Sequence, residues 1–550
     1  MSYYFSQSCG ITNSNYMIKI NIKIELILSI IMLLILISCS DNTSDDKDHL
    51  VFRYNEHKNI SSLDPAFAKD NSDIWVVNQL FNGLVEMDKD LKIIPSIARN
   101  WNISESGKVY TFNLNTNIKF HDHDLFDNRK VIAKDFSYSF DRILDEKLAS
   151  PGAWVLEKVE DYKAINDSVF EIRLKEPFNA FLGILSMKYC SVVPKEIVEH
   201  YGNDFRRNPI GTGPFKFKRW EENIKLVLRK NESYFEKDES GSALPYLEAV
   251  SVTFIPEKQS EFLEFIQSNL DFISGLDESY KDELLDRAGE LSNKYSDKIN
   301  IIRAPYLNTE YLGFYNKSSN PIATSKLIRR AINLGFDRDK MIKFLRNGIG
   351  VNANTGFIPN GLPGYSTEVY YEYNQELARE LVKQYISESG DKNPTIKLTT
   401  TSNYLVFCEF IQKEIEKIGV NIIVDVIPAS SLKEAKANGK LDFFRASWVA
   451  DYPDAQNYLS LYYSKNLAPS GPNYTHFSDD TYDNLYESSL SEKNQKTKES
   501  LYRKMDSIIM DESVIVPLYY DEVIRFTHKN VKGLGVNPIN ILDLRRVTKN

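Results

Sequence analysis

Residues 395–428 read TIKLTTTSNYLVFCEFIQKEIEKIGVNIIVDVIP, and this stretch decides the fold class. Its first and last segments, 395–401 and 420–428, have the pattern of strands. Between them, apolar residues recur at helical spacing at Leu405, Cys408, Ile411, Ile415 and Ile418. Strand, helix and strand in this order predict a βαβ unit with a right-handed crossover, and therefore an α/β protein.

Other segments repeat this mixture of strand and helix. Residues 249–255 (AVSVTFI) alternate as a strand does, and residues 324–336 (TSKLIRRAINLGF) have a helical apolar face. Residues 72–84 predict a helix with Ser72 as N-cap and with this inward face: Ile74, Val77, Leu80, Phe81 and Leu84. A chain of this length needs more than one core. We expect mixed sheets and more than one lobe.

The N-terminus has the order of a secretory signal. An apolar run at 26–37 follows two lysines and ends at Ser38-Cys39. This is the order of n-region, h-region and cleavage site, and the run is shorter than the roughly 20 residues of a membrane helix. Residues 1–38 are therefore predicted to be a signal peptide that reads naturally from Met17. An uncleaved membrane anchor is the alternative.

The residues around Cys39 suggest how the mature chain is held. The sequence LISC (36–39) resembles the lipobox of bacterial lipoproteins, which implies cleavage before Cys39 and lipid on its thiol. Residues 40–48 contain no apolar side chain, so we expect them to be disordered. Residues 39–49 are interpreted as a lipidated tether at the cell envelope, on the periplasmic or extracellular face.

Charge and cysteine content narrow the functional class. Residues 1–38 carry two lysines and one glutamate, so cleavage changes the formal net charge from −9 to −10. An acidic chain argues against nucleic acid or anionic lipid surfaces as partners. Besides Cys39, the mature chain keeps Cys190 and Cys408. Nothing in the sequence supports a disulfide between them, although that pairing stays open.

Searches for catalytic and metal motifs find none. GTGPF (211–215) lacks the Lys-Ser/Thr of a P-loop and predicts a turn. FHDHD (120–124) offers two imidazoles, too few for a closed metal site, and is better explained as a solvated turn. Asp451 and Asp454 suggest a glycosidase pair, but such carboxylates usually come from separate elements. We therefore predict no catalytic residue, no metal ligand and no cofactor.

Seven segments follow one another along the chain: SLDPAFAKDNSDIWVVNQLFNGLVEMD, IARNWNISESGKVYTFNLNTNIKFHD, IAKDFSYSFDRIL, NPIGTGPFKFKRW, IRRAINLGFDRDKMI, ASWVADYPDAQNYL and VIVPLYYDEVIRFTHKNVKGL. Their order and content resemble the family 5 solute-binding proteins, the receptors of oligopeptide and dipeptide ABC importers. The resemblance covers Phe52 to about Asp543. The chain departs from the family pattern at Asn82, usually an acid, at His123, usually glycine, and at Ala455, more commonly proline. These departures leave ligand preference open.

The resemblance implies a periplasmic binding protein-like fold of the type II, dipeptide-binding-protein-like class. Two lobes with mixed sheets enclose the ligand, and a third domain is inserted. It implies hinge strands near Arg303–Tyr306 and Tyr519–Arg525. The expected boundaries are 50–92, 191–304 and 522–550 for lobe I, 93–190 for the domain II insertion, and 305–521 for domain III, the opposing lobe.

The resemblance also assigns a binding site to RASWVADYPDAQNYL (445–459). Peptide-binding members place an aspartate after W-x-A to meet the peptide ammonium, and this position is Asp451. Several use an arginine three residues before the tryptophan to meet the carboxylate, and this position is Arg445. Trp448 and Tyr452 would wall the cleft. Charged and aromatic residues would then occur together because a peptide brings charges that are costly to desolvate unless countercharges meet them.

Together these features predict a monomeric lipoprotein that binds peptides and delivers them to ABC transporter permease subunits. It would be attached to the membrane by its lipid and would bind no nucleic acid. Three alternatives stay open. The same scaffold could bind a nickel complex, a sugar or another solute; it could serve as a surface receptor or adhesin without transport; or the chain could be an exported hydrolase.

Overall fold

The computed structural model describes residues 50–550. The predicted signal peptide, the tether and Cys39 lie outside the described residues. Within them, the largest sheet has 11 strands, and β13 (Val351–Asn352) pairs with β17 beside the main path. The order along that path is β15 (Asn421–Val426), β14 (Thr395–Thr400), β16 (Phe443–Val449), β12 (Ile299–Phe314), β17 (Ile515–His528), β11 (Phe272–Ser274), β1 (Val51–Asn55), β10 (Ala249–Thr253), β9 (Lys225–Lys230) and β8 (Phe215–Glu221).

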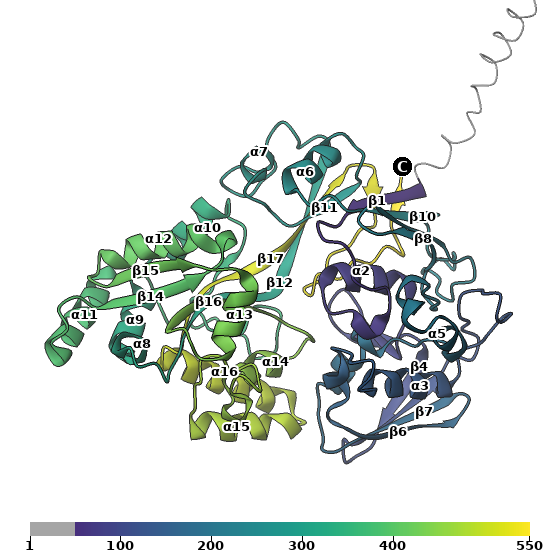
Figure 1. The fold of residues 1–550 in the computed structure, drawn as a ribbon, viewed down its shortest axis with the longest axis horizontal. Helices are drawn as coiled ribbons and strands as arrows, with labels where there is room; N and C mark the ends of the chain where they lie inside the picture. The colour runs from purple at the N-terminus through teal and green to yellow at the C-terminus, as the bar shows by residue number, and fades with distance from the viewer. Residues whose placement is uncertain (1–49) are drawn as a thin grey trace, which may run out of the picture. The chain divides into compact units, whose positions relative to one another are not determined.

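Two long antiparallel strands, β12 and β17, carry this sheet from one lobe to the other (Figure 1). On one side of this pair, β12 pairs with β16 and so joins the part of the sheet that contains β14 and β15. On the other side, β17 pairs with β11. Their register is irregular between Pro305 and Thr309. The segments expected to act as hinges, 303–306 and 519–525, lie within these two strands.

The βαβ prediction is confirmed. Strand β14, helix α12 (Leu405–Glu416) and strand β15 follow one another, and the two strands pair in parallel. Cys408 and Ile411 are buried under the sheet, as their spacing predicted. The sheet is mixed, because β12 pairs antiparallel with both neighbours. The other helices of this lobe are α8 (Pro321–Thr324), α9 (Lys326–Leu334), α10 (Arg338–Leu345), α11 (Gln375–Ser389), α13 (Ala429–Ala437), α14 (Gln456–Leu459), α15 (Asp480–Ser491) and α16 (Gln495–Asp511).

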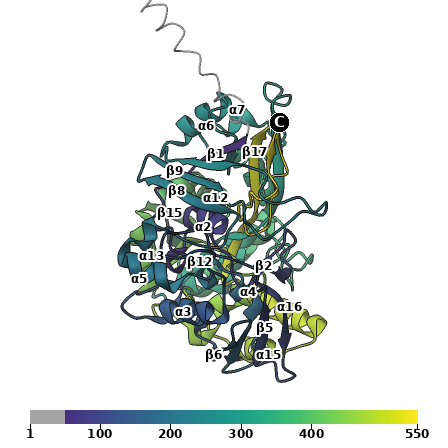
Figure 2. The same cartoon turned by 90° about the vertical axis from the view of Figure 1, so that its right-hand side faces the viewer.

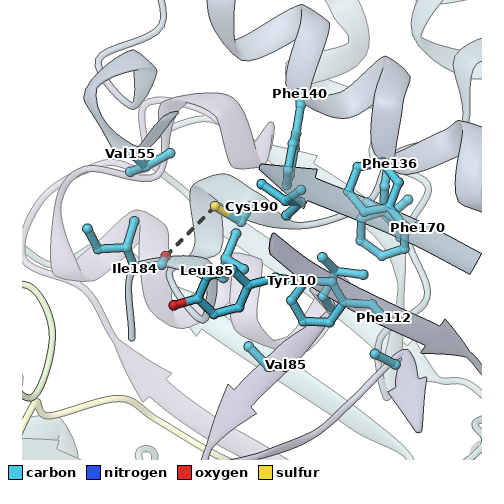
Figure 3. Packing of buried hydrophobic residues seen from close by; sticks show 14 of the residues in the cluster. Val85, Tyr110, Phe112, Phe136, Phe140, Val155, Phe170, Ile184, Leu185 and Cys190 are labelled. Atoms are coloured by element: carbon cyan, nitrogen blue, oxygen red, sulfur yellow. Dashed lines mark hydrogen bonds between the residues drawn. The ribbon is translucent and has the colours of Figure 1, made fainter. Parts of the chain in front are cut away.

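The region expected as domain II has its own sheet, with α3 (Ala133–Leu144) packed against it (Figure 2). The sheet order is β4 (Ala98–Ile103), β5 (Val109–Leu114), β7 (Val169–Leu174) and β6 (Val159–Asn166). Phe112, Phe136 and Phe170 fill its core (Figure 3). Cys190 lies in the same core, where its thiol contacts the Ile184 carbonyl, and Cys408 lies in another. Both cysteines are free, so the open disulfide pairing is not formed.

The remaining elements surround these sheets, mostly on the side of β1 and β10. They are α2 (Asn71–Leu80), β2 (Val85–Met87), β3 (Ile93–Pro95), α4 (Phe181–Leu185), α5 (Lys195–Tyr201), α6 (Lys258–Ile266), α7 (Lys281–Leu284), β18 (Val531–Lys532) and β19 (Thr548–Lys549). Short 3₁₀ turns at Pro65–Phe67, Ala153–Leu156 and Lys188–Cys190 adjoin the site described below.

The predicted start of α2 was wrong. The helix begins at Asn71 after Asp70, so Ser72 is inside it and is not the N-cap. Of the expected inward residues, Ile74 is only half-buried, and Phe81 and Leu84 are buried beyond the end of the helix. The helix buries more than one stripe because the turn at 211–213 packs on its C-terminal end. A Cβ on Gly213 would lie 2.4 Å from the Gln79 carbonyl oxygen.

Candidate functional site

Two cavities meet at the end of β16. A cavity of about 300 Å³ lies between the residues around α2, the 3₁₀ turn at Lys188–Cys190 and the segment Val449–Asp451. A larger cavity of about 860 Å³ lies between domain II and the segment 448–491. Asp451 and Trp154 line both. Sites of this size, enclosed between lobes, are where small ligands usually bind.

The loop that follows β16 is fixed by a buried carboxylate. Asp454 accepts hydrogen bonds from Lys498 Nζ at 2.6 Å and from Tyr502 Oη at 2.5 Å. It also accepts the backbone N–H of Gln456 at 2.9 Å. Lys498 and Asp454 are buried, so each neutralises the other's charge. With this ion pair, Asp454 ties the loop to α16 and is not a free partner for the glycosidase pair considered above.

Asp451 presents its carboxylate to the two cavities. Asn457 Nδ2 donates to Asp451 Oδ2 at 3.2 Å, and no described residue forms an ion pair with Asp451. The residue is exposed, but only into a cleft, and the surrounding protein raises the pKa of its carboxyl group by desolvation. An acid group in this state is stabilised by any cation that enters the cleft.

Trp448 and Tyr452 lie on either side of Asp451, and both line the larger cavity. The Trp448 indole N–H donates to Asn457 Oδ1 at 2.6 Å, so Asn457 holds Trp448 and Asp451 in one arrangement. Tyr452 is buried against the domain II core, and its hydroxyl donates to Gln456. The rings are therefore rigid walls rather than free side chains.

Arg445 lies elsewhere. Its guanidinium pairs with the buried Glu310 on β12 and stacks on the Tyr404 ring, 3.3 Å from the ring centre. It lines neither of the two cavities. Glu310 neutralises the charge of Arg445, so the guanidinium already has an anionic partner within the protein. The sequence predicted that both residues bind one ligand; Asp451 lines both cavities and Arg445 lines neither, and their shared role stays a prediction.

The two histidines of FHDHD are engaged by the protein. His121 is buried, which corrects its assignment to a solvated turn. His121 Nδ1 accepts the Gly211 N–H at 3.3 Å, and Nε2 lies 3.0 Å from the Gly213 carbonyl. His123 Nε2 lies 3.1 Å from the Tyr201 hydroxyl. No set of three or more metal-ligating side chains occurs within residues 50–550.

Several lining residues were not predicted from the sequence. Trp154, Lys188 and Tyr306 face the smaller cavity, and they come from a 3₁₀ turn of domain II, a second such turn and β12. None lies in a periodic apolar pattern, and only the fold brings them next to Asp451. Asn457 lies inside the quoted stretch, six residues after Asp451, and its amide was the one signal there for a partner of that carboxylate.

Comparison with known proteins agrees with this architecture. Residues 92–469 match the model of the bacterial extracellular solute-binding proteins, family 5 (middle region). The chain belongs to this family. Within residues 50–550, no helix of this family 5 protein combines the length and apolar character needed to cross a bilayer.

Individual relatives cover nearly the whole chain. The dipeptide-binding protein DppE of Bacillus subtilis is 24% identical over 91% of this chain and 92% of its own. The periplasmic oligopeptide-binding protein OppA of Salmonella typhimurium is 26% identical, with coverage of 90% and 91%. A solved structure of the Helicobacter pylori periplasmic binding protein DppA with the peptide STSA has a TM-score of 0.75 and 25% identity, covering 91% of this chain and 98% of that one. The family 5 chain thus has the type II binding-protein fold.

Proposed function

We propose that this family 5 protein captures peptides between its lobes and delivers them to an ABC importer. The observation that carries the proposal is Asp451, a carboxylate without an ion-pair partner among the described residues, at the junction of two interlobe cavities. A peptide ammonium would supply the missing cation, and Trp448 and Tyr452 would exclude water around it. The names of the relatives DppE and OppA support the choice of peptide over other solutes.

The domain boundaries expected from the sequence belong to this proposal. Residues 50–92, 191–304 and 522–550 would form lobe I, 93–190 domain II and 305–521 domain III. The separate four-stranded sheet within 93–190 and the β12–β17 crossover support this division. The protein would act as a monomer and would carry out no chemistry on its ligand.

Direct identification of the bound ligand tests the function. Native mass spectrometry of gently purified protein should show adducts with peptide masses, and denaturation should release those peptides unchanged. A peptide mixture incubated with excess protein should also be recovered intact. Adducts with sugar or metal-complex masses would favour another solute, and shortened peptides would favour a hydrolase.

The membrane anchor is a separate part of the proposal. Cys39 would carry the lipid that keeps the protein beside its importer, because the LISC sequence resembles a lipobox. The Cys39→Ala variant should incorporate no labelled fatty acid and should stay uncleaved or be mislocalised. A Cys190→Ala variant, which removes a buried thiol, is the control and should be labelled like the wild type. Labelling of Cys39→Ala would refute the lipobox interpretation.

A further inference from the structure

Lys188 is a cation without a partner in the same cavity as Asp451. It lines the cavity of about 300 Å³, on the 3₁₀ turn Lys188–Cys190. No hydrogen bond or ion pair of its ammonium group occurs within residues 50–550. The three N–H donors of a lysine are strongly hydrated in water, so a half-buried lysine that lines a cavity and has no protein acceptor has donors available to a ligand there.

Charges of both signs surround Lys188. Burial lowers the pKa of its ammonium, the carboxylates Glu86 and Asp543 raise it, the Arg545 guanidinium lowers it, and the net direction is downward. Neither carboxylate is within ion-pair distance of Lys188, because both are held by Arg545, at 2.9 Å and 2.8 Å. Arg545 also binds Glu236 at 2.5 Å. The acid groups thus stabilise the charge of Lys188 without occupying its hydrogen-bond donors.

The smaller cavity is therefore bipolar. Asp451 lines it with an anionic group, and Lys188 and the exposed Lys69 line it with cationic groups. Asp451 and Lys188 are close enough for Asp451 to act electrostatically on Tyr189, the next residue after Lys188. A ligand that fills this cavity meets unpaired charges of both signs.

We propose that Lys188 binds a carboxylate of the ligand and so determines specificity for peptides that carry an anionic group at this subsite. This rests on the proposed peptide-binding function. A carboxylate fits better than a neutral carbonyl, because enclosure removes water from the ammonium and only an anion compensates for that loss. The carboxylate comes either from the peptide C-terminus or from an acidic side chain.

The size of the effect follows from the neighbouring charges. A hydrogen bond to a charged group contributes about 1.5–3 kcal/mol, which corresponds to roughly ten- to a hundredfold in affinity. Glu86 and Asp543 weaken the attraction for a second anion. We therefore expect about a tenfold effect, at the lower end of that range.

The experiment is a cycle across protein and ligand. Calorimetry measures a short peptide with a free C-terminus and an acidic side chain, its C-terminal amide, and its Asp→Asn or Glu→Gln analogue. The wild type should bind one of the two neutral analogues about tenfold more weakly than the parent peptide. The analogue that binds more weakly shows whether the carboxylate comes from the C-terminus or from the side chain. Lys188→Met should bind the parent peptide about tenfold more weakly and should lose the difference between the parent and the sensitive analogue.

Two further variants distinguish a direct contact from general damage. Lys188→Arg keeps the charge and should keep the preference for the anionic peptide. Lys134→Met removes the same charge from an exposed position on α3 and should bind like the wild type. If wild type binds all three peptides equally, or if Lys188→Met keeps the preference, the proposal is wrong while peptide binding stands. If wild type binds none of the peptides and carries none after purification, the peptide function itself fails.

Discussion

At the scale of single residues, the site is defined by what is left unpaired. Most buried charges of the described chain have direct partners, such as Lys498 with Asp454 and Arg445 with Glu310. Asp451 and Lys188 are different, because each faces a cavity without an opposite charge in contact. Proteins seldom leave charges in this condition unless a ligand completes them. An unpaired charge that lines a cavity therefore indicates the candidate site, whereas buried groups such as Asp506 and Arg338 lack an ion pair among the described residues but are hydrogen-bonded by the backbone.

Replacing Asp451 by Asn tests the role of its charge. Asn keeps the shape and can still interact with Asn457, but a peptide ammonium would then be desolvated without a counterion. Loss of one member of a buried charged pair costs about 2–5 kcal/mol, roughly thirtyfold to several thousandfold in affinity. Calorimetry should show this loss for a peptide with a free N-terminus.

An N-acetylated peptide is the control for that measurement. It carries no ammonium, so it should bind the wild type weakly and lose little more on mutation. Comparing both peptides on both proteins isolates the pairing energy from general damage. Equal losses for the two peptides would make Asp451 a structural residue, and the ammonium partner would have to be sought elsewhere in the cleft.

The sequence predicted Asp451 as a ligand-binding residue, which stays a prediction, but it did not predict the residues around it. The motif around it follows β16, and Asp451, Trp448 and Tyr452 do line the cavities. Arg445 is three residues before Trp448 on the same strand, and yet Glu310 of the neighbouring strand β12 takes its charge. Lys188 and Trp154 come from short 3₁₀ turns that no periodic pattern predicts. Partners from other strands and turns depend on tertiary packing, which a linear motif does not contain.

At the scale of elements, the loop between β16 and α14 owes its shape to α16. Lys498 and Tyr502 lie one helical turn apart on α16 and both donate to Asp454. This contact places Asp451, three residues earlier in the chain, at the junction of the two cavities. The helix thus positions Asp451 although no residue of α16 lines either of the two cavities.

Removing Lys498 should destabilise the protein. Lys498→Met leaves Asp454 as an uncompensated buried charge, which typically costs about 3–5 kcal/mol. Thermal unfolding followed by circular dichroism should show a markedly lower Tm for this variant. The double variant Lys498→Met/Asp454→Asn removes both charges and should recover part of the loss. A single variant with the stability of the wild type would contradict a buried ion pair.

The turn at 211–213 depends on a neutral imidazole. His121 Nδ1 accepts the Gly211 N–H, so a proton on Nδ1 would oppose that donor. Burial lowers the pKa of His121 from 6.5 to about 4. Because the folded pKa is below the unfolded one, the unfolded chain takes up a proton first as pH falls. The stabilisation is complete above pH 6.5 and is lost as pH falls from 6.5 to about 4.

This predicts a specific pH dependence of stability. Between pH 7 and pH 4 the unfolding free energy of the wild type should fall by up to about 3 kcal/mol through His121, at 1.36 kcal/mol for each pKa unit. His121→Gln should be less stable than the wild type at pH 7 and should lose less stability on acidification. Tm measured at several pH values on both proteins gives the comparison. Parallel curves would mean that His121 does not titrate in this range.

At the scale of the whole molecule, the fold class was predictable and the contacts between lobes were not. The βαβ unit at 395–428 has local patterns that suffice to predict two parallel strands and a helix. The β12–β17 crossover was expected only from the family resemblance, because two strands separated by some 200 residues leave no local trace of their pairing. The walls of the smaller cavity include Tyr306 of the crossover strand β12, whose neighbours are set by long-range pairing. The fold class was therefore easier to predict from the sequence than the site.

Domain II contacts residues between 452 and 493, and closure of the lobes would form these contacts. Asn179 of domain II donates to the Glu492 carbonyl at 2.5 Å, and Lys493 donates to the Glu105 carbonyl at 2.5 Å. A Cβ on Gly183 would lie 3.3 Å from both Pro453 and Tyr452, so α4 packs directly against the loop that carries Asp451. These contacts enclose the larger cavity.

Ligand should therefore make the molecule more compact. A peptide that touches both lobes binds the closed state more tightly and shifts the population toward it. Small-angle scattering should give a smaller radius of gyration with a saturating peptide than after the peptide is removed by partial unfolding and refolding. Asp451→Asn at the same peptide concentration should stay close to the unliganded value, because it lacks the contact that links the ligand to domain III. An unchanged radius for the wild type, with saturation established by calorimetry, would contradict closure by the β12–β17 hinge and would favour a preformed site.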